Sequence, residues 1–225
     1  MTTETTDTPL HKELLELAAP VRDSVLRHRF WTGLREGGLP ATALARFVEQ
    51  DSGHLLPAYA RALARCAAAA PEDGDAQLFG QSVVGTLEAR DGLRAAYRQL
   101  IPELDLPLLA GNTEALPATA AHAFFFGAAS ATSYAAGVGA LLPMVWFNAE
   151  VSDHLRDHVV PDSRYTQWIT VYHPGDGYRY AVQAFLDLTD RFGETCSARD
   201  RQVLKDHFAQ GIRYELAFAE CCAGG

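Results

Sequence analysis

The sequence has few basic residues for its length. It contains 19 Lys and Arg against 28 Asp and Glu, which gives a formal net charge of −9 at pH 7, and no run of basic residues is present. Nucleic acids and anionic membrane surfaces are bound through basic patches. The charge balance therefore argues against nucleic acid and membrane as partners.

Targeting signals are also lacking. The first residues, MTTETTDTP, have neither the basic start nor the apolar core of a signal peptide. Residues 123–147 contain no charged side chain, but Ala, Gly and Ser dominate them and Thr132, Tyr134 and Pro143 interrupt them. A membrane-spanning helix needs about 20 mostly apolar residues. We therefore expect two buried helices in this segment, and a soluble, cytoplasmic protein.

Cysteine motifs and the common catalytic motifs are absent. The four cysteines, Cys66, Cys196, Cys221 and Cys222, show no C-x-x-C spacing, and we expect them to be reduced thiols. The chain has no G-x-G-x-x-G, P-loop, G-x-S-x-G or H-E-x-x-H motif. These absences remove the usual signals of nucleotide binding, of α/β-hydrolases and of zinc proteases.

Helical periodicity runs through almost the whole chain. Apolar residues recur every three or four positions, and no strand-like alternation persists. We predict one all-α domain over residues 9–225, preceded by a disordered tail at residues 1–8. The expected helices cover about residues 10–31, 41–70, 76–100, 119–133, 134–158, 164–172, 178–192 and 197–222.

The most informative stretch is Gly139–His158, GALLPMVWFNAEVSDHLRDH, which begins apolar and ends polar. A helix places Met144 and Asn148 on one face, and Trp146 and Glu150 on another. Because a buried polar side chain needs a partner, Asn148 and Glu150 indicate a pocket at the edge of the core. The alternative interpretation is a core helix whose polar end reaches solvent.

Polar residues in apolar surroundings occur at three further places. Asp51 and His54 are three residues apart and so share a helical face, beside the helix-weakening Gly53 and Pro57. Glu215 lies near the apolar side of the last helix, and His122 lies in an apolar run. Each also has a structural interpretation, respectively an exposed pair, a boundary carboxylate and a hydrogen-bonded core histidine. The aromatic pair Phe30-Trp31 is predicted to belong to the core.

Several short motifs follow one another along the chain. They are His28-Arg29-Phe30 before Gly38-Leu39-Pro40, Phe47 to Asp51 in FVEQD, Gly85-Thr86-Leu87-Glu88, Leu141-Leu142-Pro143 before Trp146 and Glu150, Trp168 to Tyr172 in WITVY, and Tyr214-Glu215. Their order and spacing resemble the thiaminase-II (TenA) family over nearly the whole length. The resemblance implies a haem-oxygenase-like helical bundle, in a single domain that assembles as a homo-oligomer.

The resemblance also implies roles for individual residues. Hydrolytic members of that family cleave or deaminate thiamin-derived aminopyrimidines with a cysteine after the Leu-Leu-Pro, a glutamate on the last helix and an aspartate on an early helix. Glu215 and Asp51 match the two acids and are the predicted catalytic residues. The cysteine position is Met144 here, whose thioether cannot attack as a thiolate does. The residues predicted to bind the substrate are His54, His122, Met144, Phe147, Asn148 and Tyr172.

These assignments predict a divergent TenA-like enzyme without a cofactor. It would act on a small nitrogen heterocycle, either aminopyrimidine-like or a specialised metabolite, through non-covalent acid/base chemistry. One alternative is a metal-dependent oxidase, because relatives on this fold bind two irons through carboxylates and histidines. The candidate ligands for iron are Glu88, Glu150, His173 and Asp176. The other alternative is a binding protein that keeps the pocket and has lost the chemistry.

Overall fold

The structure is a computed structural model that describes residues 8–224, and over this range the chain forms only helices and loops. The helices are α1 (Leu10–Leu26), α2 (Arg29–Glu36), α3 (Ala41–Gln50), the π-helical turn η1 (Asp51–Leu55), α4 (Leu56–Ala69), α5 (Asp73–Leu104), α6 (Pro117–Thr132), α7 (Tyr134–His158), α8 (Thr166–Tyr172), α9 (Tyr178–Thr195) and α10 (Ala198–Ala223). The all-α prediction is confirmed. The predicted tail falls almost entirely on residues outside the described range.

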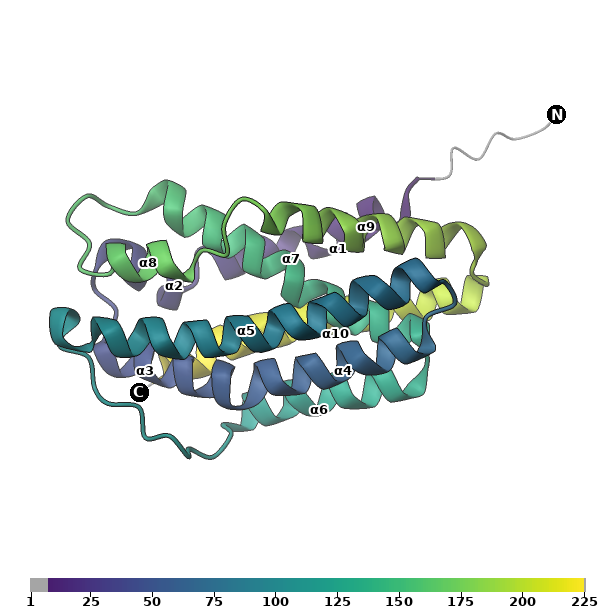
Figure 1. Cartoon of the computed structure of the whole chain (residues 1–225). Coiled ribbons are helices and arrows are strands. Elements are labelled where there is room, and N and C mark those ends of the chain that lie inside the picture. The colour runs from purple at the N-terminus through teal and green to yellow at the C-terminus, as the bar shows by residue number, and fades with distance from the viewer. Residues whose placement is uncertain (1–7, 225) are drawn as a thin grey trace.

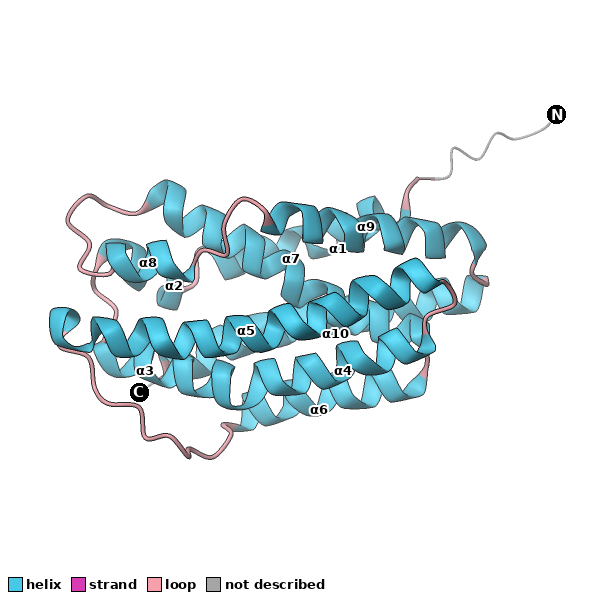
Figure 2. Cartoon of the chain, viewed as in Figure 1, coloured by secondary structure: helices cyan, strands magenta, loops and turns pink. Residues whose placement is uncertain are grey.

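The long helices lie side by side along one direction of the molecule (Figure 1). Helix α10 packs against α7 and also contacts α1, α6, α3 and α2, so it occupies the centre of the bundle. Helices α4 and α5 form an antiparallel pair that covers one side. Loops lie at the ends of the helices (Figure 2). Side chains that point inward from α7 and α10 therefore reach the interior of the bundle.

Glycines allow α7 and α10 to approach closely. A Cβ atom at Gly139 would collide with the backbone carbonyl of Leu204 on α10. A Cβ atom at Gly211 would lie 2.8 Å from Cγ of Pro143 on α7. Both positions thus need a residue without a side chain. This contact holds Met144 and Glu215 on neighbouring helices that face the same interior.

The segment without charged residues is divided between two helices, as predicted. Helix α6 ends at Thr132, and Ser133 begins α7 by accepting a hydrogen bond on its hydroxyl oxygen from the backbone N–H of Ala136. Within residues 8–224, none of the helices combines the length and the apolar character that crossing a membrane requires. The segment forms part of the core, where Phe126 and Phe147 are buried.

The predicted helix over residues 41–70 is interrupted at η1. Pro57 has no N–H to bond the carbonyl of Gly53, so an α-helical hydrogen bond is lost there, and the chain forms a wider π turn. In the wider turn, residues three apart no longer share a face. This corrects the expectation that Asp51 and His54 point in the same direction.

Candidate active site

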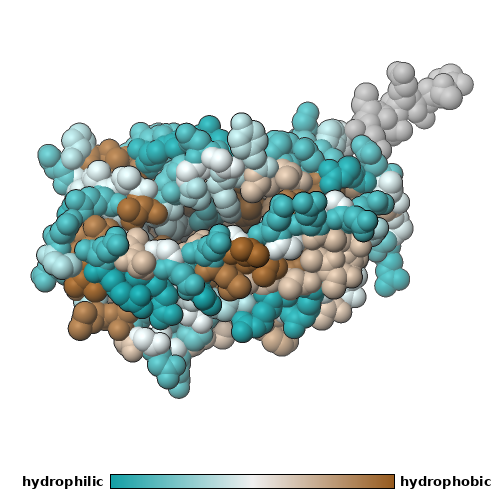
Figure 3. Space-filling model, viewed as in Figure 1, coloured by the Kyte–Doolittle hydropathy of each residue, from teal (hydrophilic) through white to brown (hydrophobic). Residues whose placement is uncertain are grey.

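A cavity of about 830 Å³ lies inside the bundle, with walls from α1, α2, α3, η1, α4, α5, α7, α8, α9 and α10. In Figure 3 a hollow with hydrophobic atoms separates α5 from α9. Most of the lining side chains are apolar or aromatic. The charged residues that line the cavity are all acidic, namely Asp51, Glu88 and Glu215. The cavity therefore favours a ligand that is a base or a cation over an anion.

Asp51 begins the π turn and points into the cavity, where the residue is only 8% exposed. Within residues 8–224 its carboxyl group has no hydrogen bond or ion pair. Burial raises the pKa of Asp51 to about 7, because the charged form is poorly solvated there. A buried carboxyl group without a protein partner is well placed to bind a polar group of a ligand.

Glu215 enters the same cavity from α10, and its side chain is 14% exposed. Its Oε1 atom is buried and has no hydrogen-bond partner among the described residues. Burial, together with the nearby charge of Asp51, raises the pKa of Glu215 from 4.5 to about 8. At pH 7 Glu215 is therefore mostly protonated and can donate a proton.

His122 lies next to Glu215 but does not line the cavity. Its ring is fully buried and stacks on Tyr214 with centroids 5.2 Å apart. Its Nε2 atom is 3.8 Å from Oε1 of Glu215, and neither ring nitrogen has a hydrogen-bond partner in the described structure. Burial lowers the pKa of His122 to about 3, so the ring is neutral. His122 is therefore neither a direct ligand contact nor a hydrogen-bonded core histidine.

The remaining walls suit a flat ring. Met144, Phe147, Asn148 and Tyr172 all line the cavity, as predicted. Asn148 donates a hydrogen bond from Nδ2 to the phenol oxygen of Tyr172 over 3.3 Å. The Tyr172 ring stacks on Trp31 at a centroid distance of 6.0 Å. This aromatic wall lies close to Asp51. The pKa of Tyr172 is raised mainly by the burial of its phenol group and also by the charge of Asp51.

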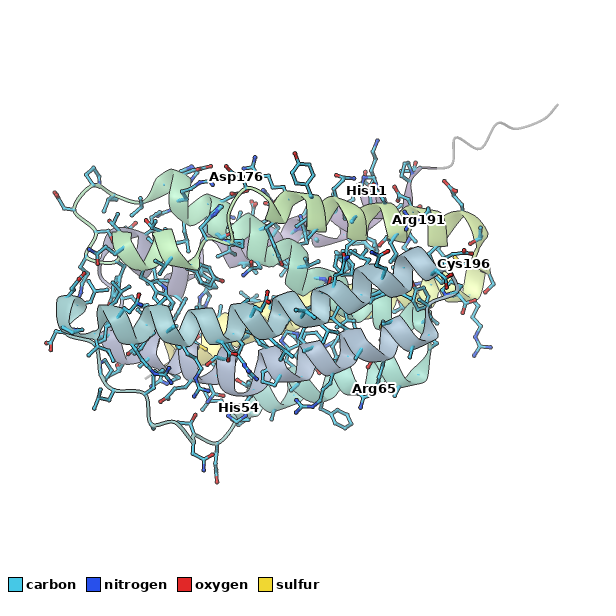
Figure 4. All side chains as sticks on the ribbon, in the orientation of Figure 1. His11, His54, Arg65, Asp176, Arg191 and Cys196 are labelled. Atoms are coloured by element: carbon cyan, nitrogen blue, oxygen red, sulfur yellow. The ribbon has the colours of Figure 1, made fainter. Side chains whose placement is uncertain are left out.

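The structure corrects two further predictions and adds one residue. Trp31, expected only in the core, also lines the cavity. His54 does not line it, because the π turn directs its ring to the loop after α5, where Nε2 lies 2.8 Å from the carbonyl oxygen of Thr113 (Figure 4). Tyr178, which the sequence did not single out, also lines the cavity, and its pKa is raised by burial and by the charge of Glu215. The sequence feature that could have indicated Tyr178 is its position directly after the His173–Gly177 turn.

The four alternative iron ligands do not converge. Glu88 is on the exposed rim of the cavity, and Glu150 pairs with Arg22 of α1. His173 Nε2 lies 2.9 Å from Oδ1 of Asp153, and Oδ1 of Asp176 accepts a hydrogen bond from Arg156 over 3.1 Å. Figure 4 shows Asp176 on the opposite side of the molecule from His54. Within residues 8–224, no three His, Cys, Asp or Glu side chains form a group that could hold a metal ion.

Comparison with known proteins identifies the family of this chain. Residues 16–220 match the TENA/THI-4/PQQC family. The chain belongs to this family. An aminopyrimidine aminohydrolase from Bacillus subtilis is 25% identical over 194 residues, which are 85% of this chain and 80% of that protein. The thiamine biosynthesis multifunctional protein ThiED from Corynebacterium efficiens is 31% identical over 173 residues, which are 76% of this chain and 22% of that protein.

Solved structures of TenA homologues have the same fold. The homologue from P. horikoshii OT3 superposes with a TM-score of 0.79 at 25% identity, covering 96% of this chain and 98% of that one. The homologue from Pyrococcus furiosus gives a TM-score of 0.80 at 16% identity, covering 95% and 99%. These likenesses confirm the haem-oxygenase-like fold. The chain spans only about a quarter of the length of the ThiED proteins, at 22% and 26%.

Proposed function

We propose that this TenA-family chain hydrolyses a thiamin-related aminopyrimidine, releasing ammonia, by non-covalent acid/base chemistry. The observation that supports this most is the pair of buried carboxyl groups, Asp51 and Glu215, in one cavity where none of the described lining residues is basic. The Bacillus subtilis relative is an aminopyrimidine aminohydrolase, which supports the same substrate class.

The two acids have different proposed roles. Asp51 lies next to the stacked rings of Tyr172 and Trp31, so its carboxyl group binds the ring nitrogen and amino hydrogens of a pyrimidine that stacks there. Glu215 is the general acid and base. Because its pKa is raised to about 8, Glu215 is mostly protonated near neutral pH and can donate this proton to the substrate.

The proposed step conserves atoms and protons. Neutral Glu215 gives its proton to the leaving amino nitrogen while the carbon–nitrogen bond breaks. A water oxygen forms the new bond to carbon, and the proton that this water loses returns to Glu215. The products are a hydroxylated pyrimidine and ammonia, with Glu215 restored to its starting state.

The proposed reaction does not use a cysteine nucleophile. Met144 occupies the position after Leu-Leu-Pro, and its thioether cannot ionise. None of the four cysteines is among the residues that line the cavity. The proposed reaction therefore uses water directly and forms no enzyme-bound intermediate.

Ammonia release from an aminopyrimidine tests the proposal. Glu215→Gln is expected to lower kcat by about a thousandfold, because it removes the acid/base group while keeping its shape. Met144→Ala, a change in the same cavity, is expected to lower the rate by less than tenfold. Equal losses in both variants would indicate damage to packing. Tight binding without ammonia release in the wild type would instead make the chain a binding protein.

A further inference from the structure

Helix α5 contains glycines that internal packing does not explain. Gly80, Gly85 and Gly92 lie in the middle of this 32-residue helix, where glycine is a poor helix former. A Cβ atom built at any of the three would meet no atom within 4 Å. The close approach that glycine permits is therefore not used by another part of the described chain.

Two of these glycines face the cavity. Gly85 and Gly92 line it together with Ala89, and these three form a strip of backbone with a single methyl group. Other side chains of α5 that line the cavity, among them Ser82, Thr86, Glu88 and Leu93, flank this strip. The other side of the opening is formed by α8 and α9. It carries two exposed apolar side chains, Val171 at 51% and Tyr180 at 81% exposure. A flat strip of α5 thus faces an apolar edge across the opening.

Aromatic contacts hold α5 at both ends of this opening. Phe79 contacts Phe185 of α9 with ring centroids 5.5 Å apart, and Tyr97 contacts Trp168 of α8 at 6.1 Å. None of the residues of α5 between Phe79 and Tyr97 is buried. At about 1.5 Å per residue, this part of the helix is about 27 Å long. This stretch of α5 is longer than a single six-membered ring.

An independent feature of the same cavity also indicates a ligand. The carboxyl group of Asp51 is more than nine-tenths buried, points into the cavity and has no partner within residues 8–224. A buried polar group of this kind anchors one end of a bound molecule. The volume of about 830 Å³ is in the upper part of the range that holds a drug-sized ligand. The anchored ring therefore leaves most of the cavity for a second part of the ligand.

We propose that the substrate is an aminopyrimidine with a flat, uncharged, apolar extension that lies on the Gly85–Gly92 strip of α5. This inference rests on the proposed function and adds the substrate class. The extension contacts the α5 backbone on one side, and the Tyr180 ring and Val171 on the other. An anionic extension is disfavoured, because Asp51, Glu88 and Glu215 are the charged residues of the lining.

Calorimetric binding of two probes tests this proposal. One probe is an unsubstituted aminopyrimidine, and the other carries a naphthylmethyl group on a ring carbon. We expect the wild-type protein to bind the extended probe at least tenfold more tightly. Gly85→Leu and Gly92→Leu place a side chain on the strip, so the ratio of the two Kd values should fall to near one. Gly80→Leu is the matched control, because Gly80 is on the same helix, has equal free space and does not line the cavity.

The outcomes separate the two proposals. Circular dichroism first establishes that each variant folds, which is expected because leucine is the better helix former. Wild-type protein that binds the bare probe but gains nothing from the naphthyl group would overturn the extension alone. The same holds if Gly85→Leu keeps the tenfold ratio, or if Gly80→Leu loses it. Failure of both probes to bind the wild type would overturn the proposed function as well.

Discussion

Glu215 has the surroundings that change its chemistry most. It shares a cavity with Asp51, and its buried oxygen faces a neutral histidine instead of a cation. Two carboxyl groups in one poorly solvated space are difficult to ionise together. Near pH 7 the pair therefore carries less than two negative charges, and Glu215 keeps the proton that the proposed reaction needs.

Which single residues line the cavity could be predicted only where the chain forms a regular α-helix. The sequence placed Met144 and Asn148 on one face, and both line the cavity with Phe147 and Tyr172. His54 was assigned to the same site through α-helical spacing, which the π turn at Asp51 invalidates. Periodicity could not separate Trp31 from the core, because its ring is nearly buried and also lines the cavity.

His122 should affect the acidity of Glu215 without contacting substrate. When Glu215 ionises, Nε2–H of His122, 3.8 Å away, is in reach to donate to the carboxylate after a small movement. The wild-type rate should fall as the pH rises through about 8, as Glu215 loses its proton. His122→Phe removes the donor and should move this alkaline limb upward by about one pH unit.

The pH dependence of kcat/KM measures this effect. His122→Gln keeps an N–H donor and should leave the limb closer to that of the wild type. A purely structural role of His122 would change the rate at every pH and leave the position of the limb unaltered. An unmoved limb in His122→Phe would therefore contradict this role.

At the scale of helices, the spacing of α7 and α10 positions the two sides of the site. Amphipathic periodicity was enough to predict most helices, the break near Ser133 and the start of the last helix near Ser197. It did not predict which helices touch, because Gly139 and Gly211 act through contacts distant in sequence. The π turn was also missed, although Gly53 and Pro57 marked its place.

Gly139→Ala should disturb the site from outside it. The new methyl group would collide with the Leu204 carbonyl and push α7 away from α10, lowering the free energy of unfolding by about 1–3 kcal/mol. Activity should fall as well, because Met144 and Glu215 lie on the separated helices. Gly127→Ala on α6 is the control, since its Cβ meets no atom within 4 Å and alanine should stabilise the helix by up to about 1 kcal/mol. Thermal unfolding and ammonia release measure both, and equal stability of the two variants would contradict the role of this contact.

At the scale of the whole molecule, the cavity lies inside an acidic bundle. The net charge of the chain is −9, which predicts that anionic partners are disfavoured. The family and the fold were available from the order of the motifs, and the family match and the solved homologues confirm them. The cavity itself could not be predicted, because its walls come from elements along the whole described chain that only the folded bundle brings together. The homo-oligomer and the cytoplasmic location stay predictions.

The buried acid should also reduce the stability of the whole protein at high pH. The pKa of Glu215 is raised from 4.5 to about 8 by folding, so the folded state binds the proton more tightly than the unfolded chain. The contribution of this carboxyl group to the free energy of unfolding is fully present below about pH 4.5, and it is lost as the pH rises through about 8. Glu215→Gln should therefore be more stable than the wild type at pH 9, by on the order of 2–4 kcal/mol, and similar at pH 4. Urea unfolding at the two pH values measures this, and a variant that is less stable at pH 9 would contradict it.

The central claim is that Glu215 is a neutral acid facing Asp51 in the cavity. Carbon-13 NMR of the glutamate side-chain carboxyl groups, with Glu215→Gln to assign the signal, measures its titration directly. The structure predicts a midpoint near 8 for this one signal. A midpoint near the ordinary value of 4.5 would mean a solvated carboxylate, and it would contradict both the site and the proposed reaction.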